Sequence, residues 1–233
     1  MEKELAAHEN LADDLASVED LEQVQRNALP RARACLETSL ELFQDGSGSD
    51  KVGIASAQLA MSYVSLEYRD FETALRYARL VVDSPIDKSS LELVSLNMFQ
   101  RQQATARMYA SEAACALGDA MASMKFLVGD GKDDAFDRLA SELGGVTIET
   151  AAANGRGKAR LANAQAMVRC SACAASASLG HLAAAKQLAM SAQAMEDACS
   201  SSRERSSARR ALVYCMLREG NSSAALTLLR SVR

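Results

Sequence analysis

Few residues in this 233-residue chain have the type and spacing needed for chemistry. Its two histidines are His8, in an acidic stretch, and His181, directly after a Leu-Gly pair. Neither has the neighbouring cysteines or acids of a metal site or a catalytic triad. The place of His181 is filled by Asp70, Asp119 and Asn221 after three similar turns. We therefore expect His181 to serve as a polar residue at a helix start rather than as a catalyst.

Three further stretches resemble reactive or ion-binding motifs only in part. CSAC, residues 170–173, has CxxC spacing, but it lies mid-helix among alanines without a second ligand pair, so packing is expected. NGRGKA, residues 154–159, lacks the spacing of a phosphate loop, and DGKDDAFD, residues 130–137, lacks the closing glutamate of an EF-hand. We therefore expect no catalytic, cofactor-binding or metal-binding residue and no cofactor: the chain is not expected to be an enzyme.

The composition favours helix over strand throughout. Hydrophobic residues make up 48% of the chain, largely alanine and leucine, whereas aromatics are 4%, tryptophan is absent and there are two prolines. The fold class expected is all-α. Six cysteines within apolar helical patterns suit a reduced intracellular protein, and no apolar run is long enough to cross a bilayer.

Charge is distributed unevenly although the formal net charge is only −4. The first residues are acidic (MEKELAAHENLADDLASVEDLEQ), and the end is basic (SSRERSSARRALVYCMLREG). One interpretation is solvated helix faces, and the other is polar ends that orient a partner. Neither region is basic enough to indicate nucleic acid as the main ligand, so no direct nucleic-acid contact is predicted.

The sequence divides into a short acidic region and a longer regular one. Residues 1–45 are expected to form an acidic N-terminal helical segment, with one helix at 2–28 and a second from Pro30. A Gly/Ser linker at 46–54 follows. From 55 to 233 the pattern is that of helix pairs, interrupted by a Gly/Asp-rich surface insertion at about 128–158 with one short helix.

Four turns share one chemistry within the longer region. Arg69, Gly118, Gly180 and Gly220 occupy the turn, where glycine allows the left-handed backbone that ends a helix. The residues seven before and five after each turn are mostly small, which lets two helices cross closely. These residues are Ser62, Ser111, Cys173 and Val213 before the turns and Ala74, Ser123, Ala185 and Ala225 after them; four residues further on lie Ala78, Leu127, Ala189 and Leu229.

This pattern resembles the tetratricopeptide repeat, which pairs a small residue in one helix with an alanine in the next. EYRDFETALRYARLVVDSP is the closest match, with Asp70, Phe71, Ala74 and Ala78 in place. The aromatic residue of the first helix is missing at Gln58, and the spacing is irregular. The resemblance implies a solenoid of helical hairpins, and the alternative is an alanine-rich helical bundle without true repeats.

A more specific resemblance covers nearly all of residues 55–233. The order of SAQLAMSYVSLEYRDFETALRYARLVVDSP, ARMYASEAACALGDAMASMKFL, the insertion, ARLANAQAMVRCSACAASASLGHLAAAKQLA and ARRALVYCMLREGNSSAALTLLR is similar to the carboxy-terminal repeats of one family. That family is the tenth subunit of the CCR–NOT messenger-RNA deadenylase complex. The resemblance implies a non-catalytic scaffold that binds the eleventh subunit and the amino-terminal region of the large NOT scaffold. It also implies a cytoplasmic location, with the nucleus left open.

Partner binding is expected on the first helices of the pairs, because these line the concave wall of stacked hairpins. The alternative is that the acidic first helices fold back and fill this groove. The residues expected to bind partners are apolar and recur on one side of these helices: Leu59, Tyr63, Leu66, Met108, Tyr214 and Leu217.

A tetratricopeptide adaptor in another cytoplasmic assembly, such as a chaperone cofactor, is the alternative function. In that family, chaperone-tail binders carry a Lys and Asn clamp on the first helix. The aligned positions here are Leu59 and Tyr63, then Met108 and Glu112. Because this groove lacks the clamp, it is not suited to a free carboxylate.

Overall fold

The computed structural model describes residues 30–43, 50–85, 93–129, 134–146, 155–195, 198–199 and 202–230. These ranges contain helices joined by turns and no strand, which confirms the all-α prediction for this part of the chain. The chain divides into two compact units, residues 1–50 and residues 51–233. The division falls inside the predicted linker, although residues 51–54 are already helical.

The described part of the first unit is one helix at residues 30–43. It begins at Pro30, as predicted, because a proline loses no hydrogen bond in the first turn of a helix. An ion pair between Arg33 Nε and Glu37 Oε1, 3.1 Å apart, joins successive turns on its surface. The helix predicted at 2–28 lies outside the described residues.

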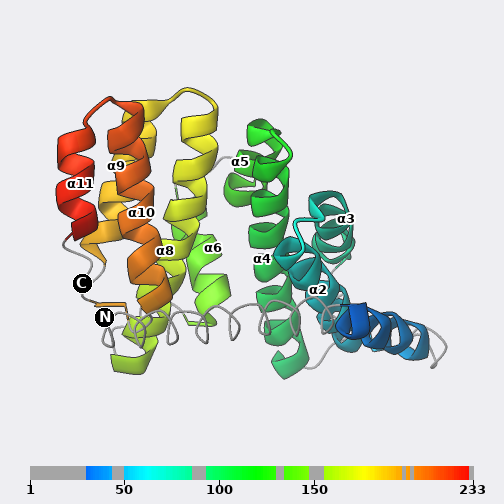
Figure 1. The fold of residues 1–233 in the computed structure, drawn as a ribbon. Helices are drawn as coiled ribbons and strands as arrows, with labels where there is room; N and C mark the ends of the chain where they lie inside the picture. The colour runs from blue at the N-terminus through cyan, green and yellow to red at the C-terminus, as the bar shows by residue number, and fades with distance from the viewer. Residues whose placement is uncertain are drawn as a thin grey trace, which may run out of the picture. The chain divides into compact units, whose positions relative to one another are not determined.

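The second unit consists of helices that pack mainly on their neighbours in sequence (Figure 1). Short turns join α2 to α3, α4 to α5, α8 to α9 and α10 to α11, and α6 lies between the second and third of these pairs. The bounds are α2 Lys51–Glu67, α3 Phe71–Val82, α4 Leu93–Ala116, α5 Ala120–Val128, α6 Ala135–Gly144, α8 Gly155–Ser178, α9 Leu182–Ala194, α10 Ser202–Arg218 and α11 Ser222–Arg230.

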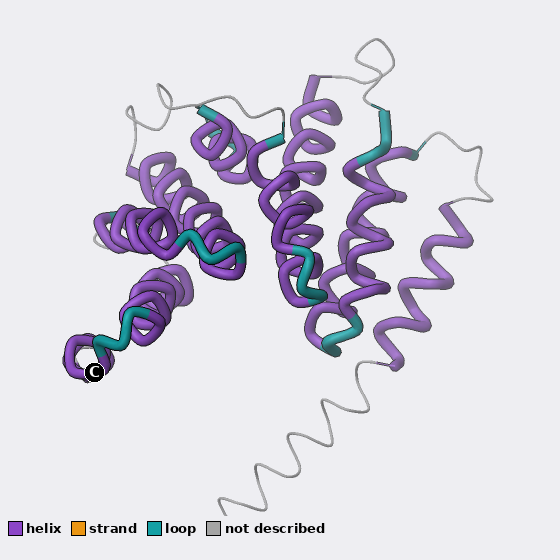
Figure 2. The backbone as a smooth tube through the Cα atoms, turned by 90° about the horizontal axis from the view of Figure 1, so that it is seen from above, coloured by secondary structure: helices purple, strands orange, loops and turns teal. Residues whose placement is uncertain are grey.

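The first helices of the four pairs follow one another in space. α2 contacts α4, α4 contacts α8, and α8 contacts α10. The second helix of each pair packs on its own first helix, and α3, α5 and α9 also reach the first helix of the next pair. Figure 2 shows these elements from above, with the short loops at the ends of the helices. One wall of this unit is therefore built by helices that are far apart in sequence.

The four predicted turns have the same backbone geometry. Each turn residue has a positive φ: 60° at Arg69, 86° at Gly118, 82° at Gly180 and 77° at Gly220. In each turn, the N–H of the following residue donates to a carbonyl five residues earlier, as from Asp119 to Ala114 O at 2.9 Å. This is the hydrogen bond of a Schellman cap. Arg69 takes this conformation without being glycine, which is strained for a side-chain-bearing residue.

Small side chains meet between the two helices of a pair, as the spacing predicted. Ser62 Oγ donates to Ala74 O at 2.9 Å, and Ser111 Oγ lies 2.9 Å from Ser123 Oγ, each pair 12 residues apart. All eight residues at these positions are buried. Of the positions four residues further on, Leu229 is the exception, with 47% of its surface exposed, because α11 is the last described helix and packs mainly on α10.

The second helix of each pair begins with a polar residue. Asp70 Oδ1 accepts from Thr73 N at 3.2 Å, Asp119 Oδ1 from Ala122 N at 2.9 Å, and Asn221 Oδ1 from Ala224 N at 3.2 Å. His181 occupies the same position before α9, but its side chain makes no capping hydrogen bond. His181 therefore lies at the start of a helix, as predicted, but its side chain does not cap that helix.

We expect His181→Asp to stabilise the protein by about 1 kcal/mol, because an aspartate there can accept the hydrogen bond that the other three pairs make. Asp119→Ala should lower the free energy of unfolding by a similar amount of about 1 kcal/mol. Urea unfolding followed by circular dichroism measures both. Equal stability of His181→Asp and the parent chain would contradict the expectation.

The predicted insertion at 128–158 contributes to the core, which corrects the expectation that it lies on the surface. Its helix α6 buries Leu139 and Ala140 in one cluster with Leu127 of α5 and Val168 of α8. α6 presents these residues on one face, so it fills the space between the second and third pairs. The sequence did not indicate this apolar face, because glycine and aspartate are frequent on either side of α6.

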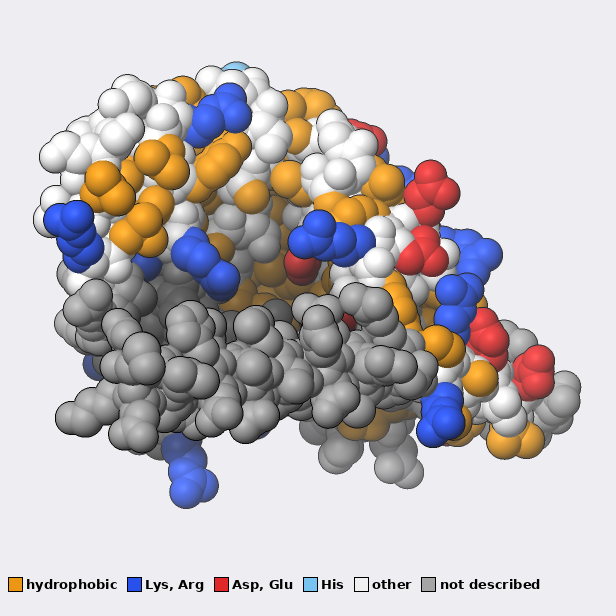
Figure 3. Space-filling model, viewed as in Figure 1, with side chains coloured by type: hydrophobic (Ala, Val, Ile, Leu, Met, Phe, Trp, Pro, Cys, Tyr) orange, Lys and Arg blue, Asp and Glu red, His pale blue; other side chains and the backbone are white. Residues whose placement is uncertain are grey.

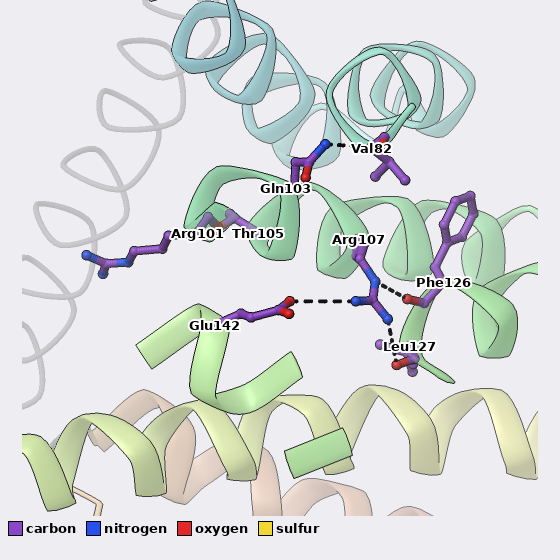
Figure 4. A network of polar contacts seen from close by, with 8 residues as sticks. All are labelled: Val82, Arg101, Gln103, Thr105, Arg107, Phe126, Leu127 and Glu142. Carbon is purple, nitrogen blue, oxygen red and sulfur yellow. Dashed lines mark hydrogen bonds and ion pairs between the residues drawn. The ribbon is translucent and has the colours of Figure 1, made fainter. Parts of the chain in front are cut away.

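Arg107 of α4 holds the ends of α5 and α6 together (Figure 4). Its Nε donates to Phe126 O at 2.8 Å and its Nη2 donates to Leu127 O at 3.1 Å. These carbonyls belong to the last turn of α5, where intrahelical partners are missing. The guanidinium also lies 3.7 Å from Glu142 Oε2 of α6. One side chain thus satisfies a helix end and joins three helices.

Candidate functional site

A groove of about 570 Å³ lies among the described residues and is lined mainly by the first helices of the four pairs. α2, α4, α8 and α10 each contribute side chains, and α5 adds one. The lining is uncharged apart from one acid and one base. It comprises Tyr63, Met108, Tyr109, Ser111, Glu112, Cys115, Ala116, Ser123, Met167, Cys170, Ser171, Ala174, Ser207 and Arg210; we call this set the groove.

Two tyrosines form one side of the groove. The rings of Tyr63 and Tyr109 have centroids 6.0 Å apart and are tilted by 37°. Such aromatic pairs present a rigid apolar surface with a polar tip, which suits protein recognition. The opposite side, from α8, offers Cys170, Ser171 and Ala174, which are small. Figure 3 shows the hollow in this face, with hydrophobic side chains around it.

The predicted partner-binding residues differ in how much of their surface is exposed. Tyr63, Tyr214 and Leu217 are 41%, 40% and 52% exposed. Leu59 and Leu66 are half-buried, and Leu59 packs against the core cluster of α2, α3 and α4. Of these five residues, Tyr63 lines the groove.

Met108, which the sequence predicts to bind a partner, is 5% exposed and packs with Leu127, Leu139 and Val168. The reason is α6, whose apolar face covers this region of α4. Met108 therefore belongs to the core and reaches the groove only at its floor.

Sequence reasoning missed most of the groove, although the turns contain a signal for it. Ten residues before three of the turns lie Met108, Cys170 and Arg210, and all three line the groove. Six residues before the first three turns lie Tyr63, Glu112 and Ala174, which line it as well, whereas Tyr214 at the fourth turn is not in the lining. Extending the alignment to these two positions would have found Cys170, Ala174 and Arg210.

A buried thiol pair lies behind the α8 wall of the groove. Cys173 Sγ of α8 is 3.5 Å from Cys215 Sγ of α10, and both are buried. Burial raises the pKa of the Cys173 thiol well above its ordinary value, with further increases from the hydrogen bond and proximity to Cys215 and from Cys170. A thiol held in its neutral form is a poor nucleophile. Cys173 thus acts in packing, as predicted, whereas Cys170 lines the groove.

Parts of the other two weak motifs, residues 130–133 and 154, lie outside the described residues. Residues 155–159 form the first turns of α8, with the exposed Arg156 and Lys158 pointing from a regular helix rather than from a phosphate loop. No group of three or more potential metal ligands occurs within the described ranges. None of the described helices has the length and hydrophobicity required to span a bilayer. The groove is therefore the feature on which a functional hypothesis can rest.

Comparison of the chain with protein-family models, with curated proteins and with solved structures found no match.

Proposed function

We propose that the chain is a non-catalytic scaffold with a tetratricopeptide-like arrangement of helical hairpins, and that its groove binds a segment of a partner protein. The observation that carries the proposal is the joint lining of the groove by α2, α4, α8 and α10. A concave wall built from first helices is the usual binding surface of stacked hairpins. The Tyr63–Tyr109 pair supplies the aromatic anchor that such surfaces use.

Repetition of one hairpin design supports the solenoid. The four turns share a left-handed residue, and small residues 12 apart meet across two of the pairs through hydrogen bonds. α6 departs from a regular array, since it is a single helix between two pairs. A solenoid with one inserted helix is consistent with both the four similar hairpins and the single helix α6.

We further propose that the scaffold belongs to the CCR–NOT messenger-RNA deadenylase complex, where it would bind the eleventh subunit and the amino-terminal region of the large NOT scaffold. The support is the order of helix pairs and the place of the insertion in the sequence. Affinity purification of the tagged chain from its source cells, followed by mass spectrometry, tests this assignment. Recovery of a different cytoplasmic assembly without deadenylase subunits would instead favour the adaptor alternative.

The groove itself is tested by Tyr63→Ser, which we expect to weaken partner binding by about 1–2 kcal/mol, as for other interface anchors. Tyr63 is 41% exposed, so its removal should leave the fold intact. Tyr68→Ser is a matched control, because Tyr68 is 38% exposed and lies outside the groove. Titration of the recovered partner by calorimetry measures both, and equal losses for the two variants would place the binding surface elsewhere.

A further inference from the structure

We propose that the occupant of the groove is an acidic amphipathic helix of a partner protein, which lays its apolar side on Tyr63, Tyr109 and Met167 and its acidic side along α8 and α10. This inference rests on the proposed scaffold function and names the chemistry of the partner. Helices bind grooves in this way by presenting apolar residues at a spacing of three and four.

The charge of α8 and α10 indicates an acidic occupant. α8 carries four basic residues and no acidic one, and α10 carries five basic residues and one acidic residue. The whole chain, by contrast, has a net charge of −4. In the sequence, basic residues therefore concentrate in these two helices more than in the chain as a whole; of those on α8, Arg169 is paired with Asp137 of α6 at 2.9 Å.

Several of these basic residues lie where an occupant would pass. Arg210 lines the groove, and its Nη2 donates to Ser207 Oγ at 3.1 Å, which orients the guanidinium beside the cavity. Arg160 and Arg156 are exposed and stand seven and eleven residues before Met167, so they continue the groove-facing side of α8. The Arg210 guanidinium has five N–H donors, and Ser207 accepts from one of them. Carboxylates of an occupant can accept hydrogen bonds from the others.

The acid in the groove lining, Glu112, comes from α4 rather than from α8 or α10. Figure 3 shows Lys and Arg side chains on both sides of the hollow, and Asp and Glu side chains interspersed with Lys and Arg toward α3. The proposed orientation follows from the positions of these charges: the acidic side of the helix faces Arg210 of α10 and the end of α8 at residues 156–160, and an uncharged side faces Glu112 of α4.

The shape of the groove favours a helix. Cys170, Ser171 and Ala174 form a wall of small residues on α8, which lets a helix backbone approach closely. Large side chains from the occupant would then fill the space between this wall and the Tyr63–Tyr109 pair. A volume of about 570 Å³ is enough for several such side chains.

Four labelled synthetic peptides test the proposal against the full chain by fluorescence anisotropy. Three share one apolar leucine face and carry glutamate, glutamine or lysine on the remaining positions. The fourth has the sequence of residues 2–28, which is itself acidic. We expect the glutamate peptide to bind at least tenfold tighter than the lysine peptide, with the glutamine peptide in between. Its affinity should fall as salt is added.

The charge-reversal variants Arg210→Glu and Arg160→Glu localise the effect. Each should weaken the glutamate peptide about tenfold and reduce its advantage over the lysine peptide. Arg76→Glu is the matched control, because Arg76 is an exposed arginine of α3, which lends no side chain to the groove. Circular dichroism melting curves verify that each variant is folded before its affinity is compared.

The outcomes separate this inference from the proposed function. Equal or tighter binding of the lysine peptide, or no binding of any peptide, would overturn the acidic helix, while co-purification of deadenylase subunits could still succeed. Tightest binding of the fourth peptide, lost in Arg210→Glu, would assign the groove to acidic residues of this chain and overturn the partner origin. A glutamate preference that survives both Arg210→Glu and Arg160→Glu would place the site elsewhere.

Discussion

Replacing Arg107 by methionine is expected to lower the free energy of unfolding by about 3 kcal/mol. The substitution keeps an unbranched side chain but removes the two N–H groups that bind Phe126 O and Leu127 O at 2.8 and 3.1 Å. Hydrogen bonds from a charged donor contribute about 1.5–3 kcal/mol each, and these carbonyls end a helix beside a buried leucine. The ion pair with Glu142 adds little, since the Glu142 side chain is 38% exposed.

Arg101→Met is the matched control for this measurement. Arg101 lies on the same helix and is exposed, and its Nε donates to Leu143 O at 3.1 Å. We expect this variant to lower the free energy of unfolding by about 1 kcal/mol, because it leaves one carbonyl without its donor, whereas Arg107→Met leaves two. Urea unfolding followed by circular dichroism gives both values. Equal losses in the two variants would show that the α5 end is held by other contacts.

Ala185→Leu is expected to lower the free energy of unfolding by about 2–3 kcal/mol through overpacking. Ala185 is fully buried in α9, in one cluster with Cys173 and Cys215. The close approach of α9 and α8 leaves no room for three further carbon atoms without a shift of a helix. Because the pair also packs on α10, the shift would be transmitted to the thiol contact.

The neighbouring alanine provides the comparison. Ala184 is exposed on the same helix, so Ala184→Leu makes the same change in helix propensity without the crowding. We expect it to alter the stability by less than about 0.5 kcal/mol. The difference in free energy of unfolding between the two variants, measured by chemical unfolding, gives the effect of crowding where α8 and α9 cross. Similar stability of the two would mean that Ala185 is not a point of close contact.

Local features of the fold could be predicted from the sequence because their chemistry lies within one turn. Glycine at 118, 180 and 220, followed by a polar residue, is sufficient to locate a helix end and the next helix start. The small residues 12 apart were predicted for the same reason, since both lie close to the turn that joins their helices.

Features that depend on distant segments could not be predicted in this way. The burial of Met108 follows from the packing of α6, which begins 27 residues later in the chain. The groove combines Tyr63 with Arg210, which are on the first and last of the four first helices. A periodic pattern describes one helix at a time, so it does not indicate which faces remain uncovered after the helices have packed.

The contacts between residues 12 apart have a consequence for how the chain folds. Each joins helices linked by a short turn, so its formation closes a small loop and costs little chain entropy. Proteins dominated by such local contacts fold rapidly. We therefore expect each hairpin to form early and by itself, whereas the thiol contact between α8 and α10, 42 residues apart, is made when formed hairpins dock. The protein would then fold by docking of preformed helical hairpins rather than by collapse around a single nucleus.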